Sequence, residues 1–165
     1  MIRVLRAIFY IGPLLLWMGI LFSMSTDVGS MQSTSGFIAV FVKFIAPDLA
    51  ASLTPVQWEH VERVIRKAAH LFEYAVLMLL AVRAIQYGRP HLRTRSVLIA
   101  FVITALFAVT DEIHQSFVPS RTALPTDVLI DITGATIATV LLLIWVGIRH
   151  VERLLKGSTG AASRR

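Results

Sequence analysis

Four long apolar stretches alternate with shorter polar segments along this chain. The first covers residues 4–24, in which Arg6, close to the start, is the one charged residue. Three more follow at residues 68–86, 96–117 and 128–148, each with polar groups near one end. A helix of about 21 residues rises roughly 31 Å, which matches the thickness of a bilayer core. The pattern predicts an all-α, polytopic membrane protein built as a bundle of four transmembrane helices.

The connection between the first two apolar stretches, residues 25–66, is expected to contain structure of its own. Residues 36–46 are apolar but too short to cross a bilayer, which indicates an interfacial or re-entrant segment in this loop. Thr54, Pro55 and Gln57 have the order of a helix start with a capping box. A helix that begins there can continue without a break into the second crossing.

Basic residues are concentrated beside three of the predicted helix ends. Those next to the start of the first crossing, around the second connection and after the last crossing are Arg3, Arg6, Arg83, Arg89, Arg93, Arg95, Arg149, Arg153, Lys156, Arg164 and Arg165. The two connections on the opposite side hold Lys43, Arg63, Arg66 and Arg121. Because basic residues favour the cytoplasmic side, we expect a multi-pass protein of the cell membrane with both termini in the cytoplasm.

The composition supports this interpretation and restricts the chemistry. Apolar residues make up 56% of the chain and charged residues 16%, whereas soluble domains carry about 25% charged residues. The net charge is +6, but the basic residues flank apolar segments and form no aromatic-interleaved face, so no nucleic acid is expected. The absence of cysteine excludes thiolate ligands and a cysteine nucleophile. We expect one transmembrane domain over residues 1–150 and a basic, disordered cytoplasmic tail over residues 151–165.

Ionisable residues lie at the same predicted depth in three of the crossings. Lys67, His70, Glu73 and Tyr74 are three and four residues apart, so they line one face of the second helix. A charged side chain at mid-membrane costs about 2.5–3.5 kcal/mol on insertion scales. Several such residues together therefore require mutual pairing, water or a ligand.

The third helix carries a second polar group at the same end. Asp111, His114 and Gln115 share a face there, while Glu112 is turned about 100° away. Arg121 follows in the next turn. These residues are expected to meet the polar face of the second helix.

The fourth helix opens with two carboxylates, Asp127 and Asp131. Their face continues through Gly134 and Ala138, small residues that allow a neighbouring helix to approach closely. Asp127 also has an ordinary explanation as an N-cap or first-turn acid. Asp131 lies one turn deeper, where that explanation does not apply.

Three blocks of sequence carry a resemblance to a known family. They are residues 22–25 (Phe-Ser-Met-Ser), residues 67–74 (Lys-Ala-Ala-His-Leu-Phe-Glu-Tyr) and residues 111–121 (Asp-Glu-Ile-His-Gln-Ser-Phe-Val-Pro-Ser-Arg), continuing to Asp127, Asp131 and Gly134. In these blocks the chain resembles the VanZ-like membrane proteins of bacteria, named after a protein associated with teicoplanin resistance. The resemblance names a family and implies no established reaction.

We consider His70, Glu73, Asp111 and His114 as catalytic candidates. The substrate-binding candidates are Lys67, Tyr74, Glu112, Gln115, Arg121, Asp127 and Asp131. In this hypothesis two cations, Lys67 and Arg121, hold a phosphate or carboxylate while a histidine transfers protons and a carboxylate orients the imidazole.

Two alternatives use the same residues differently. Imidazoles and carboxylates at helical spacing can ligate a metal, although the neighbouring cations weaken that hypothesis. The polar residues can also serve only to pair helices. The pairs expected in that case are Lys67 with Asp111 or Glu112, and Arg121 with Asp127 or Asp131.

The sequence thus favours a VanZ-like protein of the cell envelope with a polar site in the outer leaflet. That site is expected to bind or modify an anionic lipid or a cell-wall precursor, and the resemblance implies a link to glycopeptide (teicoplanin) resistance. The alternative is a non-enzymatic scaffold or a small transport component. Apolar cytoplasmic halves of the helices disfavour a continuous pore. The sequence leaves open whether the protein is an enzyme. It also leaves open the substrate, any cofactor or metal, and the oligomeric state.

Overall fold

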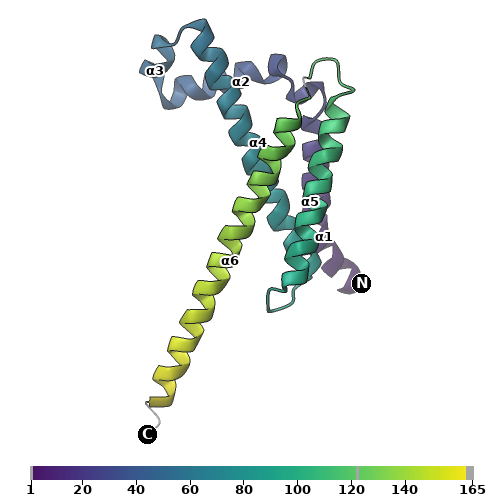
Figure 1. Cartoon of the computed structure of the whole chain (residues 1–165), viewed down its shortest axis with the longest axis vertical. Helices are drawn as coiled ribbons and strands as arrows, with labels where there is room; N and C mark the ends of the chain where they lie inside the picture. Colours follow the sequence, from purple (N-terminus) through teal and green to yellow (C-terminus); the bar gives the residue numbers. More distant parts are fainter. Residues whose placement is uncertain (1, 122, 163–165) are drawn as a thin grey trace.

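Four long helices dominate the computed structural model (Figure 1). It describes the backbone of residues 2–121 and 123–162, and the side chains of these ranges except at residues 29, 31–33 and 154–162. The long helices are α1 (Ile2–Met24), α4 (Pro55–Gln86), α5 (Thr94–Gln115) and α6 (Pro125–Ala162). Each is long and apolar enough to span a membrane. The predicted all-α bundle of four membrane-spanning helices is confirmed.

The second predicted crossing is the last part of a much longer helix. α4 begins at Pro55, and Thr54 and Gln57 form the expected capping box. In it the backbone amide of Gln57 donates to the Thr54 side chain. The helix is 32 residues long, from Pro55 to Gln86. It ends at Tyr87, which has a left-handed backbone with φ of 47°, followed by Gly88 with φ of +76°. The second crossing is therefore positioned by a helix that begins four turns before it.

Two short helices occupy the first connection. α2 (Met31–Ile45) and α3 (Pro47–Ser52) follow a 3-10 turn, η1 (Asp27–Gly29), and lie beside the first turns of α4 (Figure 1). Phe37 and Phe44 of α2 expose 78% and 84% of their surface. At 15 residues α2 is too short to span a bilayer, as its apolar run predicted. Its interfacial or re-entrant placement stays a prediction.

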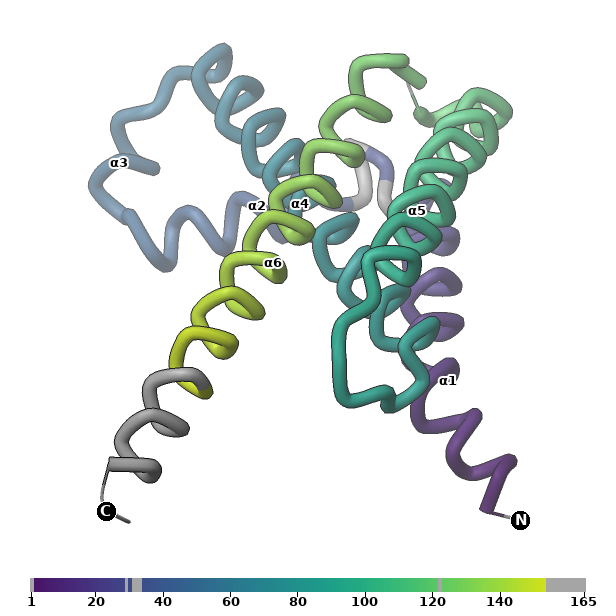
Figure 2. The backbone as a smooth tube through the Cα atoms, turned by 60° about the horizontal axis from the view of Figure 1, so that its bottom comes forward, coloured from purple at the N-terminus to yellow at the C-terminus, as the bar shows by residue number. Residues whose placement is uncertain are grey.

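α4 is the central helix of the bundle. It contacts α1, α5 and α6, and Figure 2 shows the chain of α4 running between them. Its buried Leu77 and Met78 belong to one core cluster with alanines of α5 and α6. Ala100 and Ala108 on α5 and Ala135 on α6 are fully or almost fully buried. Small side chains at these positions let the helices approach closely.

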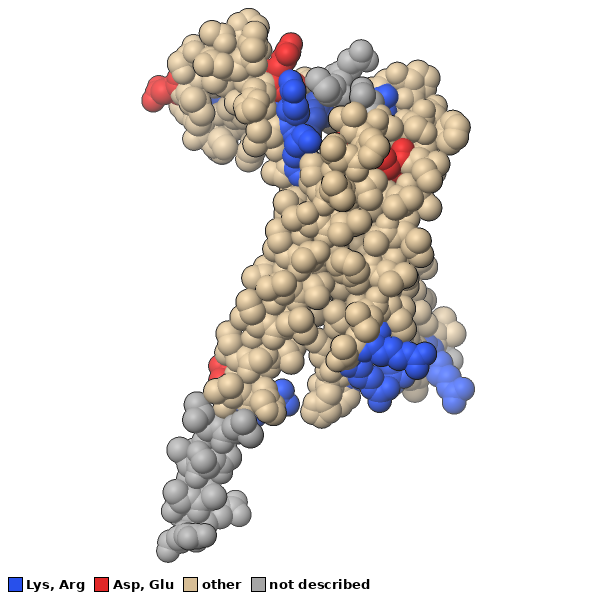
Figure 3. Space-filling view, viewed as in Figure 1, with Lys and Arg blue, Asp and Glu red and all other residues tan. Residues whose placement is uncertain are grey.

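The bundle has two chemically different ends. Lys and Arg gather where α1 begins, at the α4–α5 connection and along the distal part of α6, and Figure 3 shows part of this gathering at its lower edge. We call this the basic end. There Arg6 lies over the Tyr87 ring at 5.2 Å and donates to the Tyr87 carbonyl at 3.2 Å. The other end carries α2, α3 and the α5–α6 connection, and we call it the polar end.

The division into a domain over residues 1–150 and a tail over residues 151–165 stays a prediction. The backbone of α6 continues to Ala162. Residues 163–165 lie outside the described part of the chain.

Candidate functional site

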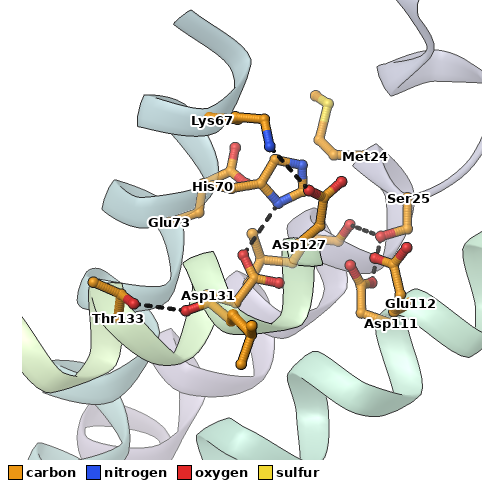
Figure 4. A network of polar contacts seen from close by, with 12 residues as sticks. Met24, Ser25, Lys67, His70, Glu73, Asp111, Glu112, Asp127, Asp131 and Thr133 are labelled. Atoms are coloured by element: carbon orange, nitrogen blue, oxygen red, sulfur yellow. Dashed lines mark hydrogen bonds and ion pairs between the residues drawn. The ribbon is translucent and has the colours of Figure 1, made fainter. Parts of the chain in front are cut away.

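The polar residues predicted from the helical spacing gather at the polar end of the bundle. Figure 4 shows His70 and Glu73 of α4 facing Asp127 and Asp131 of α6, with Asp111 of α5 close by.

An imidazole–carboxylate pair joins α4 to α6. His70 Nδ1 lies 3.2 Å from Asp131 Oδ1, and Asp131 is 1% exposed. A carboxylate that accepts a hydrogen bond from Nδ1–H fixes the tautomer and orientation of the ring and leaves Nε2 as a proton acceptor. His70 itself is half-buried and borders a cavity. The pair thus has the geometry of an oriented general base.

A glycine makes this pairing possible. Gly134 lies one turn beyond Asp131, and a Cβ built on it would overlap the backbone carbonyl oxygen of Leu71. α6 therefore approaches the backbone of α4 directly at this level. The close approach lets the short Asp131 side chain reach His70.

A second ion pair links the same two helices nearer the end of the bundle. Lys67 Nζ lies 3.5 Å from Asp127 Oδ1. The expected partners of Lys67 were Asp111 or Glu112 on α5, so that pairing was wrong. Lys67 and His70 are one turn apart on α4, and their partners Asp127 and Asp131 are one turn apart on α6. The two pairs therefore stack along one seam between the helices.

A buried hydrogen-bonded group joins α1 to α5. The Ser25 hydroxyl donates to the Asp111 carboxylate and also lies 3.1 Å from the Leu21 carbonyl. The Gln115 amide donates to Asp111 Oδ2 at 3.0 Å and to Ser25 Oγ at 3.4 Å. Ser25, Asp111 and Gln115 are all buried. Asp111 is therefore held by one donor from the turn after α1 and one from its own helix.

Two arginines approach the same region, Arg66 from α4 and Arg121 from the α5–α6 connection. Arg121 donates to the Met24 carbonyl at 2.8 Å, and Arg66 donates to Thr34 of α2 and lies 3.4 Å from Ser35 Oγ. Burial lowers the pKa of Arg121, while Asp111 and then Glu112 raise it. An arginine side chain is not deprotonated in proteins, so Arg121 supplies a positive charge to this region.

These groups surround a cavity of about 220 Å³. Its polar lining consists of Ser25 after α1, Thr34 of α2, four residues of α4 (Arg66, His70, Glu73 and Tyr74), Asp111 of α5 and Arg121 of the α5–α6 connection. Leu21, Met24, Ile38, Ile65 and Ala69 complete the wall. The volume is below the roughly 300–1,000 Å³ of pockets for drug-sized ligands, so it suits a headgroup and not a whole lipid.

Six predicted site residues do not border the cavity: Lys67, Asp127 and Asp131, which belong to the two α4–α6 pairs, and Glu112, His114 and Gln115. The Glu112 carboxylate accepts from the backbone amide of Leu124 and so fixes the α5–α6 connection. The His114 ring stacks on Phe22 of α1, with 4.4 Å between centroids and 27° between planes. Gln115 supports Asp111 and does not border the cavity. His114 therefore lies apart from His70, and the two imidazoles do not share one site.

A metal site was one of the hypotheses for the two imidazole–carboxylate groups. Among the described side chains, no group of three His, Asp or Glu is arranged to hold a metal ion.

A comparison with protein-family models gives a match over residues 9–146 with the family described as VanZ/LLP1. The chain belongs to the VanZ/LLP1 family. The matched region includes every residue of the cavity and of both α4–α6 pairs. Comparisons with curated proteins and with solved structures give no match. Membership of the VanZ/LLP1 family agrees with the resemblance of the three sequence blocks.

Three polar residues of the cavity, Ser25, Thr34 and Arg66, were not among the predicted candidates. Ser25 lies in the Phe-Ser-Met-Ser block, but a serine carries no charge and its buried role cannot be seen in hydropathy. Arg66 lies four residues before His70 and seven before Glu73, which places it on their helix face. That spacing could have identified Arg66 as a site residue. Lys67, one position later, lies at the edge of this face.

Proposed function

We propose that the cavity at the polar end binds the phosphate-bearing headgroup of an anionic lipid or of a lipid-linked cell-wall precursor. The main support for this proposal is that Arg66 and Arg121 line one headgroup-sized cavity together with His70. Guanidinium groups form charge-assisted, bidentate hydrogen bonds to phosphate. The apolar part of the wall suits the first carbons of a lipid chain.

We also propose that this site faces the outer leaflet of the cell membrane. The basic residues at the opposite end support this orientation, because short cytoplasmic connections are enriched in Lys and Arg. Both termini and the α4–α5 connection are then cytoplasmic. A ligand from the cell-envelope side would reach the cavity from the outer leaflet.

The same cavity supplies proton-transfer chemistry. His70, oriented by Asp131, can take a proton at Nε2, and Glu73 borders the cavity on the same face of α4. A phosphoester held by the two arginines would thus lie beside an oriented base. Modification of the bound headgroup is the reaction class that this arrangement supports.

A second candidate function is a non-enzymatic scaffold. It is favoured by the interhelical pairs, since Lys67 with Asp127 and Ser25 with Asp111 satisfy one another without a ligand. The transport alternative has less support, because the α4 segment nearer the basic end buries Leu77, Met78 and Ala81 in an apolar core. The glycopeptide link rests on the family resemblance.

A binding measurement separates the headgroup site from the scaffold. The full-length protein in detergent is titrated with a radiolabelled polyprenyl phosphate and with the corresponding polyprenol, which lacks the phosphate. We expect tighter binding of the phosphate form. Arg121→Gln should weaken it about ten- to a hundred-fold, as expected for the loss of a charged hydrogen bond.

The matched control is Arg63→Gln. Arg63 lies on α4 at the same end, is exposed and does not border the cavity, so its loss should change affinity little. Equal affinity for the alcohol and the phosphate, or unchanged affinity in a folded Arg121→Gln protein, would refute the headgroup site.

A further inference from the structure

A second hollow lies at the opposite end of the molecule. Below the centre of the bundle α6 diverges from α4 and α5 (Figures 1 and 2). The divergence opens a groove of about 1050 Å³ between the α4–α5 connection and the distal part of α6. Figure 3 shows the molecule hollowed here, with basic side chains beside the gap. None of the residues that line it belongs to the cavity described above.

The mouth of this groove is basic. Arg89 approaches from the α4–α5 connection, and Arg149 and Arg153 from α6. The one carboxylate paired with them is Glu152, 3.4 Å from Arg149, within the described part of the chain. Three guanidiniums against one carboxylate leave a positive mouth that complements an anion. Arg153 Nε donates to the Arg149 carbonyl at 3.0 Å, which holds its side chain against α6.

The groove becomes apolar away from its mouth. Leu142, Leu143 and Val146 of α6 form its wall, and Trp145 borders it. A further cavity of about 360 Å³ adjoins it, because Leu92, Leu143 and Val146 line both. Its other lining residues, on α5 and α6, are Thr94, Val97, Leu98 and Thr139. The hollow thus passes from charged to apolar surface along the direction of the membrane-spanning helices.

We propose that this groove binds an anionic phospholipid of the leaflet at the basic end, with the phosphate at the arginines and an acyl chain along the apolar slot. Positive charge at the mouth selects an anionic headgroup, and interfacial tryptophan is favoured at headgroup depth. The apolar slot selects a lipid over a free phosphate. The inference is independent of the proposed function, which concerns the other end.

The test counts lipids retained by the protein. The full-length chain is reconstituted with equal amounts of phosphatidylglycerol and phosphatidylcholine, extracted in mild detergent and examined by native mass spectrometry. We expect retained phosphatidylglycerol in excess over phosphatidylcholine. Arg89→Gln with Arg149→Gln should lower this retention about ten- to thirty-fold, the order expected from losing two basic contacts.

Two further variants keep the result interpretable. Arg93→Gln with Arg95→Gln removes the same charge from the same connection and helix start, outside the groove, and should retain the lipid. Gly147 lines the groove, and a Cβ there would meet nothing within 4 Å. Gly147→Trp should therefore fold normally, fill the groove and displace the lipid.

Three results would overturn the proposal. Equal retention of the two lipids would remove the anion preference. Full displacement of the phosphatidylglycerol by inorganic phosphate would indicate a simple phosphate site. A lipid-free dimer that Gly147→Trp converts to monomer would assign the groove to a second copy of the chain.

Discussion

The buried carboxylates Asp131 and Asp111 each have a partner outside their own helix. Asp131 accepts from His70, and Asp111 accepts from Ser25. These contacts are needed because an unpaired charge in the membrane costs about 2.5–3.5 kcal/mol even on insertion scales. Glu73 differs, since its side chain borders the cavity without an ion pair or hydrogen bond to the described residues.

The Ser25 hydroxyl is predicted to stabilise the fold through Asp111. Ser25→Ala would leave a buried carboxylate with one donor fewer, so we expect a loss of about 1–3 kcal/mol in the free energy of unfolding. Thermal unfolding in detergent measures this. Ser23→Ala is the control, because the exposed Ser23 hydroxyl bonds only the Gly19 carbonyl of its own helix. Equal melting temperatures for the two variants would contradict the role of Ser25.

At the scale of elements, the sequence predicted the helices better than their pairing. Apolar length located four crossings, and Thr54 with Gln57 correctly marked the start of α4. Helical periodicity also placed His70 and Glu73 on one face. It could not show which neighbour that face meets, because the rotation of one helix against another depends on packing of the whole interface. For this reason Lys67 was paired with α5 in the prediction, whereas it pairs with α6.

The contact between α4 and α6 is predicted to depend on Gly134. Alanine normally stabilises a helix relative to glycine by about 0.5–1 kcal/mol. At Gly134 the added Cβ meets the backbone of Leu71, which cannot move without shifting a helix, so Gly134→Ala should destabilise by about 1–3 kcal/mol. Gly147→Ala, in open space, should be neutral or stabilising. A higher melting temperature for both variants would contradict the close helix approach.

At the scale of the whole molecule, the two ends differ in charge, and this difference underlies the proposed orientation. The absence of native cysteine allows single cysteines to report it. Exposed positions are available at both ends, Ser52 and Ser116 at the polar end and Pro90 and Thr94 at the basic end. An impermeant thiol reagent should label only the first two in intact cells. Labelling of Thr94→Cys or Pro90→Cys in intact cells would reverse or refute the topology.

We propose that His70 and Glu73 act on a ligand and do not only brace helices. His70→Gln keeps hydrogen-bonding capacity without a titratable imidazole, and Glu73→Gln keeps shape without charge. The most direct measurement is the glycopeptide susceptibility of cells that overproduce the double variant, normalised to folded protein in the membrane. We predict a change of susceptibility with the wild-type chain and none with a double variant of near wild-type melting temperature. A folded double variant that changes susceptibility as fully as the wild type would contradict a role of His70 and Glu73 in acting on a ligand.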